Sequence, residues 1–194
     1  EMCLFKVNTG CREQEVCQLR WDWEVQLPEM GTSVFILGSS ITKTSTERVV
    51  VLNTVARRVI ESRRGMHKER VFTYRSKPLG KLHSSAWKRA WKAAKLPTEP
   101  GILKGVHNLR HTFGRRLRSA GVPLETRKAL LGHANGDITT HYSAAELHEL
   151  ISASESIVSR GRTETPNLML IRQRNEKTVG KVSEMKKGLA KKVC

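Results

Sequence analysis

The sequence lacks several features that would define other classes of protein. No apolar run approaches the length needed to span a membrane, and residues 1–8 show neither a basic leader nor a cleavage site. The four cysteines form no C-x-x-C pair, and no histidine lies beside them at zinc-ligand spacing. We therefore expect reduced thiols in a cytoplasmic protein, with Cys3, Cys11 and Cys17 facing the core.

Acidic residues are also scarce. The chain has 35 Lys and Arg against 18 Asp and Glu, which gives a formal net charge of +17. Residues 160–194 carry 10 basic against 3 acidic side chains, and residues 1–159 carry 25 against 15, so the excess is not confined to one end. This charge predicts a polyanionic partner, with nucleic acid first and an anionic membrane surface second. Because no cluster of Asp and Glu is available for two metal ions, the sequence argues against a metal-dependent nuclease.

The pattern of apolar residues predicts a mainly helical α+β domain with a small antiparallel sheet. Hydrophobic residues make up 38% of the 194 residues, enough for a core. Helices are expected over 2–8, 12–19, 53–64, 84–95, 107–121, 123–131 and from 143 onward. Strands are expected over 21–27, 33–37, 48–52 and 71–74. After residue 159 the periodicity fades, and we expect a flexible tail or an arm ordered by a partner.

Two of these helices carry unusual side chains. Trp87 and Trp91 lie one turn apart, and we expect them in the core rather than as platforms for bases. The stretch HNLRHTFGRRLR (107–118) holds two histidines and four arginines. His107 and Arg110 share a helix face that is separate from the stripe of Leu109, Phe113 and Leu117. Taken alone, such a face is most simply a solvated basic surface.

Three further motifs are ordinary when taken singly. In TGCREQE, Glu15 lies one turn after Arg12, as in a surface ion pair. Lys43 lies in TKT, at the tip of the predicted hairpin between two strands. In LLGH, His133 follows a helix end, where a cation often caps the last carbonyls. Tyr142 lies in THYS and alone would be a packing residue.

In their order along the chain, these motifs resemble the tyrosine recombinase (phage integrase) family. The correspondence is TG-x-R-x-x-E, TKT, H-x-L-R-H-T-F, L-L-G-H and T-x-x-Y-S, and it covers about residues 2–157. The resemblance implies the catalytic-domain fold of that family and a complete active site made of Arg12, Lys43, His107, Arg110, His133 and Tyr142. Glu15 resembles the acidic neighbour that holds the first arginine in place.

The resemblance also implies a domain organisation. Residues 1–158 are expected to form the catalytic domain, and residues 159–194 a basic, flexible C-terminal tail. The helical core-binding domain that normally lies upstream in the family is absent from the sequence. We therefore expect a fragment that begins inside a catalytic domain.

The resemblance assigns the bond-forming step to a protein side chain. Tyr142 would attack the phosphodiester, form a 3′-phosphotyrosyl link and release a 5′-hydroxyl. Lys43, on its hairpin, suits the general acid that protonates the departing oxygen. No metal and no cofactor is expected for this chemistry.

Four other residues would bind the scissile phosphate or move protons at it. Arg12 and Arg110 present planar forks that match its non-bridging oxygens and stay charged at any working pH. His107 and His133 titrate near neutrality, so one could accept the tyrosine proton while the other donates a hydrogen bond. The sequence leaves open which histidine does which.

The function implied is site-specific DNA recombination of the prophage or genomic-island integrase type. Two alternatives stay open: a DNA-binding remnant without recombination activity, and a type IB topoisomerase-like enzyme that relaxes DNA. The expected partners are duplex DNA, a homotetramer on DNA with a monomer in its absence, and DNA-bending accessory proteins. The expected location is the nucleoid in the cytoplasm of a bacterium, or of a cell that a phage has infected, with no membrane association.

Overall fold

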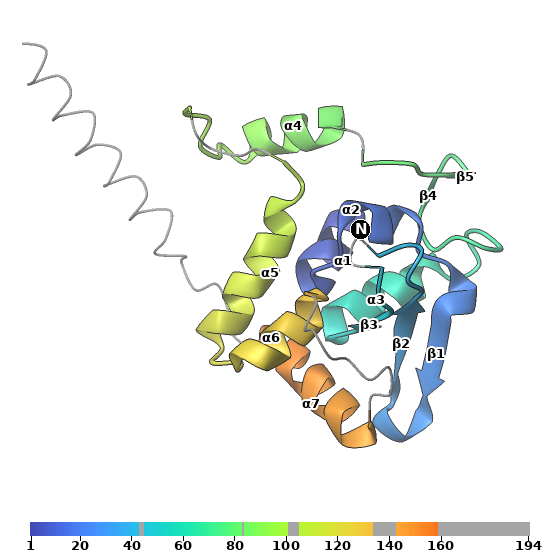
Figure 1. Ribbon diagram of the computed structural model, residues 1–194. Coiled ribbons are helices and arrows are strands. Elements are labelled where there is room, and N and C mark those ends of the chain that lie inside the picture. The colour runs from blue at the N-terminus through green and yellow to red at the C-terminus, as the bar shows by residue number, and fades with distance from the viewer. Residues whose placement is uncertain (43–44, 83, 101–104, 134–142, 159–194) are drawn as a thin grey trace, which may run out of the picture. The chain divides into compact units, whose positions relative to one another are not determined.

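The computed structural model describes residues 1–42, 45–82, 84–100, 105–133 and 143–158. The helices are α1 (Met2–Thr9), α2 (Glu13–Cys17), α3 (Thr54–Arg63), α4 (Ser84–Ala93), α5 (Asn108–Ser119), α6 (Leu124–Leu131) and α7 (Ala144–Glu155). The strands are β1 (Glu24–Leu27), β2 (Thr32–Leu37), β3 (Arg48–Val51), β4 (Thr73–Tyr74) and β5 (Lys77–Pro78). Figure 1 shows the three longer strands side by side, with helices around them.

The central sheet is antiparallel and has the order β1-β2-β3. In the register of β2 with β3, Phe35 lies opposite Val50 and Val34 lies opposite Val51. Because side chains alternate across a strand, the first pair points to one face of the sheet and the second pair to the other. All four side chains are buried. The sheet is therefore covered on both faces, which explains why the valine run of β3 contains no polar alternation.

Two hydrophobic cores lie on these two faces. The first core joins the sheet to α1, α2 and α3, and it includes Phe5, Val16, Leu19, Phe35, Leu37, Val50, Ile60 and Phe72. The second core joins the sheet to α5, α6 and α7, and it includes Val34, Val49, Val51, Phe113, Leu117, Leu130 and Leu150. Helix α1 also contacts α5 directly, so the helices of the first core and those of the second core pack against each other there (Figure 1).

The ends of several helices follow directly from the local sequence. Helix α1 ends at Gly10 and α6 ends at Gly132, and both glycines have a positive φ that other residues adopt at a cost. The Asn53 side chain accepts from the backbone N–H of Ala56 at the start of α3. Ser143 forms the predicted capping box of α7. These boundaries confirm the predicted helices.

Two predicted strands are shorter than expected. Trp21–Trp23 form a 3-10 turn, so the strand begins at Glu24. The indole N–H of Trp21 donates to the carbonyl of His67 (3.0 Å), which ties this segment to the loop that follows α3. Of the expected strand 71–74, only Thr73–Tyr74 is a strand, since the backbone N–H of Val71 donates to the carbonyl of Leu19 (3.0 Å), outside any strand.

The prediction that Trp87 and Trp91 belong to the core is wrong. Both are half-buried on α4, their ring centroids lie 6.0 Å apart, and neither is part of either core. The indole N–H of Trp91 donates to the carbonyl of Pro97 (2.8 Å). The remaining side chains described on α4 are exposed, so the two rings shield each other and the turn that follows.

No helix in the described ranges is long and apolar enough to cross a membrane. Of the predicted core cysteines, Cys11 and Cys17 are buried, whereas Cys3 is half-buried, and all three are free thiols. The predicted tail, residues 159–194, lies outside the described residues, as does the hairpin tip that carries Lys43.

Candidate active site

Arg12 lies where α1 gives way to α2. Its backbone N–H donates to Oε2 of Glu15 (2.6 Å), and its Nη1 donates to Oε1 of the same carboxylate (2.9 Å). Its Nη2 donates to the carbonyl of Gly132 (3.2 Å), far along the chain. The side chain is 19% exposed, so its guanidinium is fixed on one side and accessible on the other.

Arg110 reaches the same place from α5. Its Nη1 donates to the carbonyl of Gly10 (2.6 Å) and its Nη2 to the carbonyl of Leu131. The residue is only 4% exposed, so it is not the solvated surface group that the helix periodicity alone would suggest. Burial, and then the charges of Arg48 and Arg12, lower the pKa of Arg110 to about 9. Arg110 therefore still carries its charge at neutral pH.

The two predicted histidines border these arginines. His107 immediately precedes α5, one turn before Arg110, and its ring meets the ring of His111 edge-on at 4.7 Å between centroids. His133 follows Gly132, and its backbone N–H donates to the carbonyl of Lys128 (3.0 Å). Both residues are exposed overall, although neighbouring groups partly desolvate their imidazole rings.

Both histidines have a lowered pKa. For His107 the causes are burial, then His111, Lys6, Arg110 and Arg12. For His133 the causes are burial, then Arg110, Arg12, Arg48 and Lys128. The lowered pKa favours the neutral imidazole, and in that state each ring can accept a proton or donate one hydrogen bond.

The structure thus brings four of the six predicted site residues together, namely Arg12, His107, Arg110 and His133. The other two, Lys43 and Tyr142, lie outside the described residues. Glu15 contacts Arg12 as the motif predicted, and its carboxylate is almost completely buried. Burial alone would raise the pKa of Glu15, but the charge of Arg48 and the hydrogen bonds from Arg12 outweigh it and lower the pKa.

Sequence reasoning missed two charged residues at this site. Arg48 is 3% exposed and pairs with Glu15, and Lys6 is fully buried with no hydrogen-bond partner for its Nζ among the described residues. The signal for Arg48 was available, because it begins a strand of valines that are all buried. Lys6 offers a weaker signal, since it lies in the last turn of α1, where a lysine commonly faces solvent.

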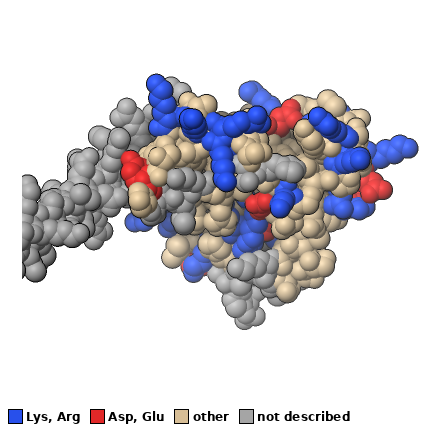
Figure 2. Space-filling model, turned by 90° about the horizontal axis from the view of Figure 1, so that it is seen from above, with Lys and Arg blue, Asp and Glu red and all other residues tan. Residues whose placement is uncertain are grey.

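The site is strongly positive. Within the described residues, three arginines gather here, and one carboxylate, that of Glu15, pairs with two of them, Arg12 and Arg48, while Arg110 bonds backbone carbonyls. The charges that remain uncompensated favour an anion, and a phosphate offers oxygens that suit guanidinium forks. In the described part of the chain, no three His, Cys, Asp or Glu side chains gather as a metal site. In the view from above in Figure 2, Lys and Arg also clearly outnumber acidic side chains on the surface.

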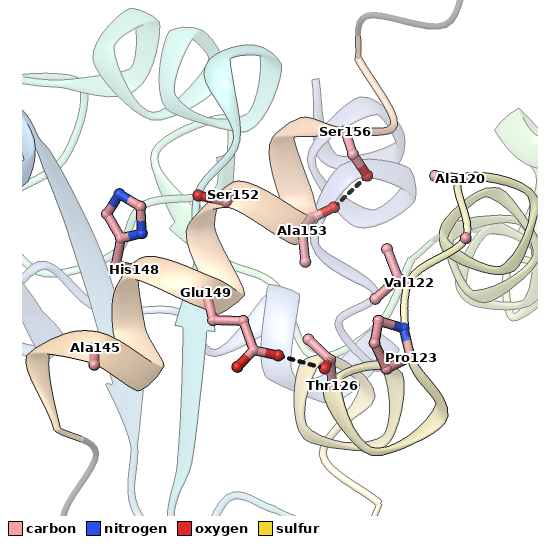
Figure 3. Close-up of a pocket in the computed structure, with 11 residues that line it drawn as sticks. Ala120, Val122, Pro123, Thr126, Ala145, His148, Glu149, Ser152, Ala153 and Ser156 are labelled. Carbon is pink, nitrogen blue, oxygen red and sulfur yellow. Dashed lines mark hydrogen bonds between the residues drawn. The ribbon is translucent and has the colours of Figure 1, made fainter.

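A groove of about 400 Å³ lies elsewhere, between the α5–α6 turn and α7. Figure 3 shows Val122 and Pro123 on one side and Ala153 on the other, with Thr126 donating to Glu149 (2.6 Å) across it. None of the four described site residues lines this groove, so it is separate from the candidate active site.

The chain belongs to the phage integrase family, whose model matches residues 1–149. It is 28% identical over 178 residues to the integrase of Salmonella phage P22, an alignment that covers 84% of this chain and 43% of that integrase. The chain therefore spans less than half the length of this relative.

The fold is similar to that of solved recombinases. XerH site-specific recombinase bound to difH substrate, in a pre-cleavage complex, matches with a TM-score of 0.52 and 19% identity over 82% of this chain and 42% of XerH. The post-cleavage complex with palindromic difH matches with a TM-score of 0.53 and 22% identity over 78% and 44%. These similarities confirm the predicted α+β fold, that of a tyrosine recombinase catalytic domain.

Proposed function

We propose that the protein is a site-specific DNA recombinase of the prophage or genomic-island integrase type. It would break and rejoin duplex DNA through a 3′-phosphotyrosyl intermediate. The observation that carries the proposal is the meeting of Arg12 and Arg110 at one positive site, with His107 one turn before Arg110 and His133 directly after Gly132, whose carbonyl accepts from Arg12. Family membership and the complete set of motifs support the same reading.

In the proposed reaction, the Tyr142 hydroxyl attacks the scissile phosphorus. The phenol proton passes to one of the neutral imidazoles, His107 or His133. The new phosphorus–oxygen bond replaces the bond to the 5′-oxygen, which leaves as a hydroxyl after protonation by Lys43. Rejoining reverses these steps, so the bond energy is kept in the phosphotyrosyl link and no ATP is required.

The arginines serve the transition state. Extra negative charge develops on the two non-bridging oxygens as the phosphorus becomes five-coordinate, and fixed cations stabilise that charge more than the ground state. Arg12 has an accessible side, whereas Arg110 is held by two carbonyls, so the two forks are oriented before DNA arrives. Such preorganisation avoids a reorganisation cost during the reaction.

The proposal extends to the organisation of the chain. Residues 1–158 would be the catalytic domain, and the basic residues 159–194 a tail ordered by a partner. Four protomers would assemble on two DNA sites, with a monomer in the absence of DNA, and DNA-bending accessory proteins would assist. XerH bound to difH offers a precedent for a DNA substrate in this fold.

A suicide-substrate assay tests the proposed function. Nicked duplexes that carry randomised sites are incubated with the protein without metal and analysed on a denaturing protein gel. We expect a DNA-shifted covalent band that disappears in Tyr142→Phe, and sequencing of the trapped DNA gives the target site. DNA binding without a band, also after an upstream core-binding domain is restored, would indicate a remnant. Relaxation of plasmids that lack the trapped site would indicate a topoisomerase-like enzyme.

A further inference from the structure

Arg48 contacts two chain segments that each carry a candidate catalytic residue. Its Nη1 pairs with Glu15, and its Nη2 donates to the carbonyls of Leu130 (2.9 Å) and Thr9 (3.4 Å). Thr9 ends α1, three residues before Arg12, and Leu130 lies in the last turn of α6, three residues before His133. One guanidinium at the start of β3 thus ties both segments to the sheet.

The C-terminal end of α6 is held by arginines in an unusual way. Its last carbonyls accept from three different guanidinium groups: Arg48 donates to Leu130, Arg110 to Leu131 and Arg12 to Gly132. The final carbonyls of a helix have no partner inside the helix, and the helix dipole places negative charge there. Three cations therefore fix the point at which the chain turns to His133.

Arg48 differs from Arg12 in its burial, whereas Arg110 is as deeply buried as Arg48. Only 3% of the Arg48 side chain is exposed, compared with 19% for Arg12, and its two terminal nitrogens are taken by Glu15 and by two backbone carbonyls. Arg48 is also the arginine that contacts both Glu15 and the end of α6 from the sheet. Gly132 packs directly on it: a Cβ there would collide with the aliphatic part of Arg48 and lie 2.7 Å from its Nε. The backbone immediately before His133 therefore packs closely against the Arg48 side chain.

We propose that Arg48 is a positioning residue for strand cleavage, which aligns Arg12 through Glu15 and seats His133 through the end of α6. The proposal rests on the proposed function, since it assigns Arg48 a part in that reaction. Arg48 is not one of the six residues that the motifs assign to the active site.

The guanidinium is suited to this task in a way that an ammonium group is not. Its two terminal nitrogens diverge, so one reaches the carboxylate while the other reaches the two carbonyls. A lysine keeps the charge but offers one nitrogen. We therefore expect Arg48→Lys to keep the fold and part of the activity, and Arg48→Met to keep only the packing of the aliphatic chain.

Single-turnover cleavage of the suicide substrate, at saturating DNA, is the first measurement. We expect Arg48→Met to lower the cleavage rate by about tenfold to a hundredfold, while DNA affinity changes by less than about threefold. Arg48→Lys should retain more of the rate than Arg48→Met. The matched control is Arg63→Met, because Arg63 also pairs with a carboxylate (Glu1) and a carbonyl (Val71), but on α3. The control should cleave at the wild-type rate.

A second measurement does not depend on activity. NMR titration of the His133 imidazole in the free protein reports the charges around it, which come from Arg110, Arg12, Arg48 and Lys128. Arg48→Met removes one of these positive charges, so we expect the pKa of His133 to rise, whereas Arg48→Lys and Arg63→Met should leave it near the wild-type value.

The two measurements separate the possible failures. If wild-type protein forms no covalent band, the proposed function fails, and the titration still decides whether Arg48 sets the surroundings of His133. If the band forms but folded Arg48→Met cleaves as fast as wild type and His133 titrates unchanged, the positioning role is wrong. Should Arg48→Met not fold, Arg48→Lys decides the matter, because wild-type cleavage with one nitrogen lost would overturn the proposal.

Discussion

The molecule holds two arginine clusters built on opposite principles. At the surface, Arg64 pairs with two carboxylates, Glu24 and Glu61 (both 2.8 Å), and lies over the ring of Trp21. In the buried cluster of Arg12, Arg48 and Arg110, the carboxylate of Glu15 pairs with Arg12 and Arg48, and backbone carbonyls accept from the other terminal nitrogens. The Nε of Arg48 is buried without a hydrogen-bond partner among the described residues. The surface cluster has a surplus of negative charge and the buried cluster a surplus of positive charge.

The difference in net charge distinguishes the Arg64 cluster, a structural ion-pair network, from the buried cluster, which is suited to bind an anion. Burying uncompensated charge is costly, and a cluster selected only for stability would pair its ions or replace them with apolar groups. The buried cluster keeps three cations around one carboxylate, and backbone carbonyls are the only partners of Arg110 among the described residues. Such an arrangement is expected where an anion completes the charge balance.

Removing a buried arginine should have the largest effect. Arg110→Met leaves the carbonyls of Gly10 and Leu131 without their donor and removes one fork of the phosphate clamp. We expect the single-turnover cleavage rate to fall by about 10²–10³-fold or more. Arg64→Met in the surface cluster should leave the rate unchanged, and equal losses in both variants would remove the distinction drawn between the clusters.

The second prediction concerns stability. Glu15→Gln removes the carboxylate that two arginines share, so we expect a loss of about 3–5 kcal/mol in the free energy of unfolding, as for a broken buried ion pair. Glu61→Gln, at a carboxylate that is 56% exposed, should change it by less than about 1 kcal/mol. Chemical denaturation of both variants provides the measurement.

The same carboxylate predicts a pH dependence. The pKa of Glu15 is lowered in the folded protein, so its stabilisation is complete above the ordinary value of 4.5 and is lost as the pH falls through the lower folded value. Glu15→Gln should lack this part of the acid dependence. Parallel curves for wild type and variant in this range would show that Glu15 is not held as an ion.

The third prediction compares two glycines of the same backbone conformation. Gly132 and Gly31 both have φ +58°, but a Cβ at Gly132 would collide with Arg48, whereas nothing lies within 4 Å of one at Gly31. Gly31→Ala should cost about 1–2 kcal/mol from its backbone alone. Gly132→Ala should cost more and also slow cleavage, because it displaces Arg48 from the end of α6. Thermal unfolding and the cleavage assay together check both parts.

The smallest effect is expected from the histidines. The pKa values of His107 and His133 are lowered from 6.5 in the free protein, and a bound phosphate should raise them, so DNA binding takes up protons. Affinity for DNA should therefore strengthen several-fold as the pH falls from about 8 to 6. By the same sign, the free protein should lose stability as the pH falls below 6.5. Replacing both histidines with Gln should flatten both dependences.

Local signals in the sequence were sufficient for most of the fold. Gly10 and Gly132 mark helix ends, and Ser143 with Glu146 marks a helix start, because caps and positive φ angles depend on neighbours in the chain. The strand prediction failed at Trp21–Trp23, where a hydrogen bond to a distant carbonyl decides the conformation. The prediction that Trp87 and Trp91 lie in the core failed because amphipathic spacing does not show whether another element covers that face of the helix.

The sequence by itself determined the family, the order of the site motifs and the local pairing of Arg12 with Glu15. These depend on residue types and on spacings of a few positions. Only the tertiary structure decided that Arg110 is buried, that Arg48 joins the site and that the pKa values of the two histidines are lowered. The reason is that charge interactions depend on distance in space and on burial, and the residues concerned come from α1, β3, α5 and α6, which the fold alone brings together.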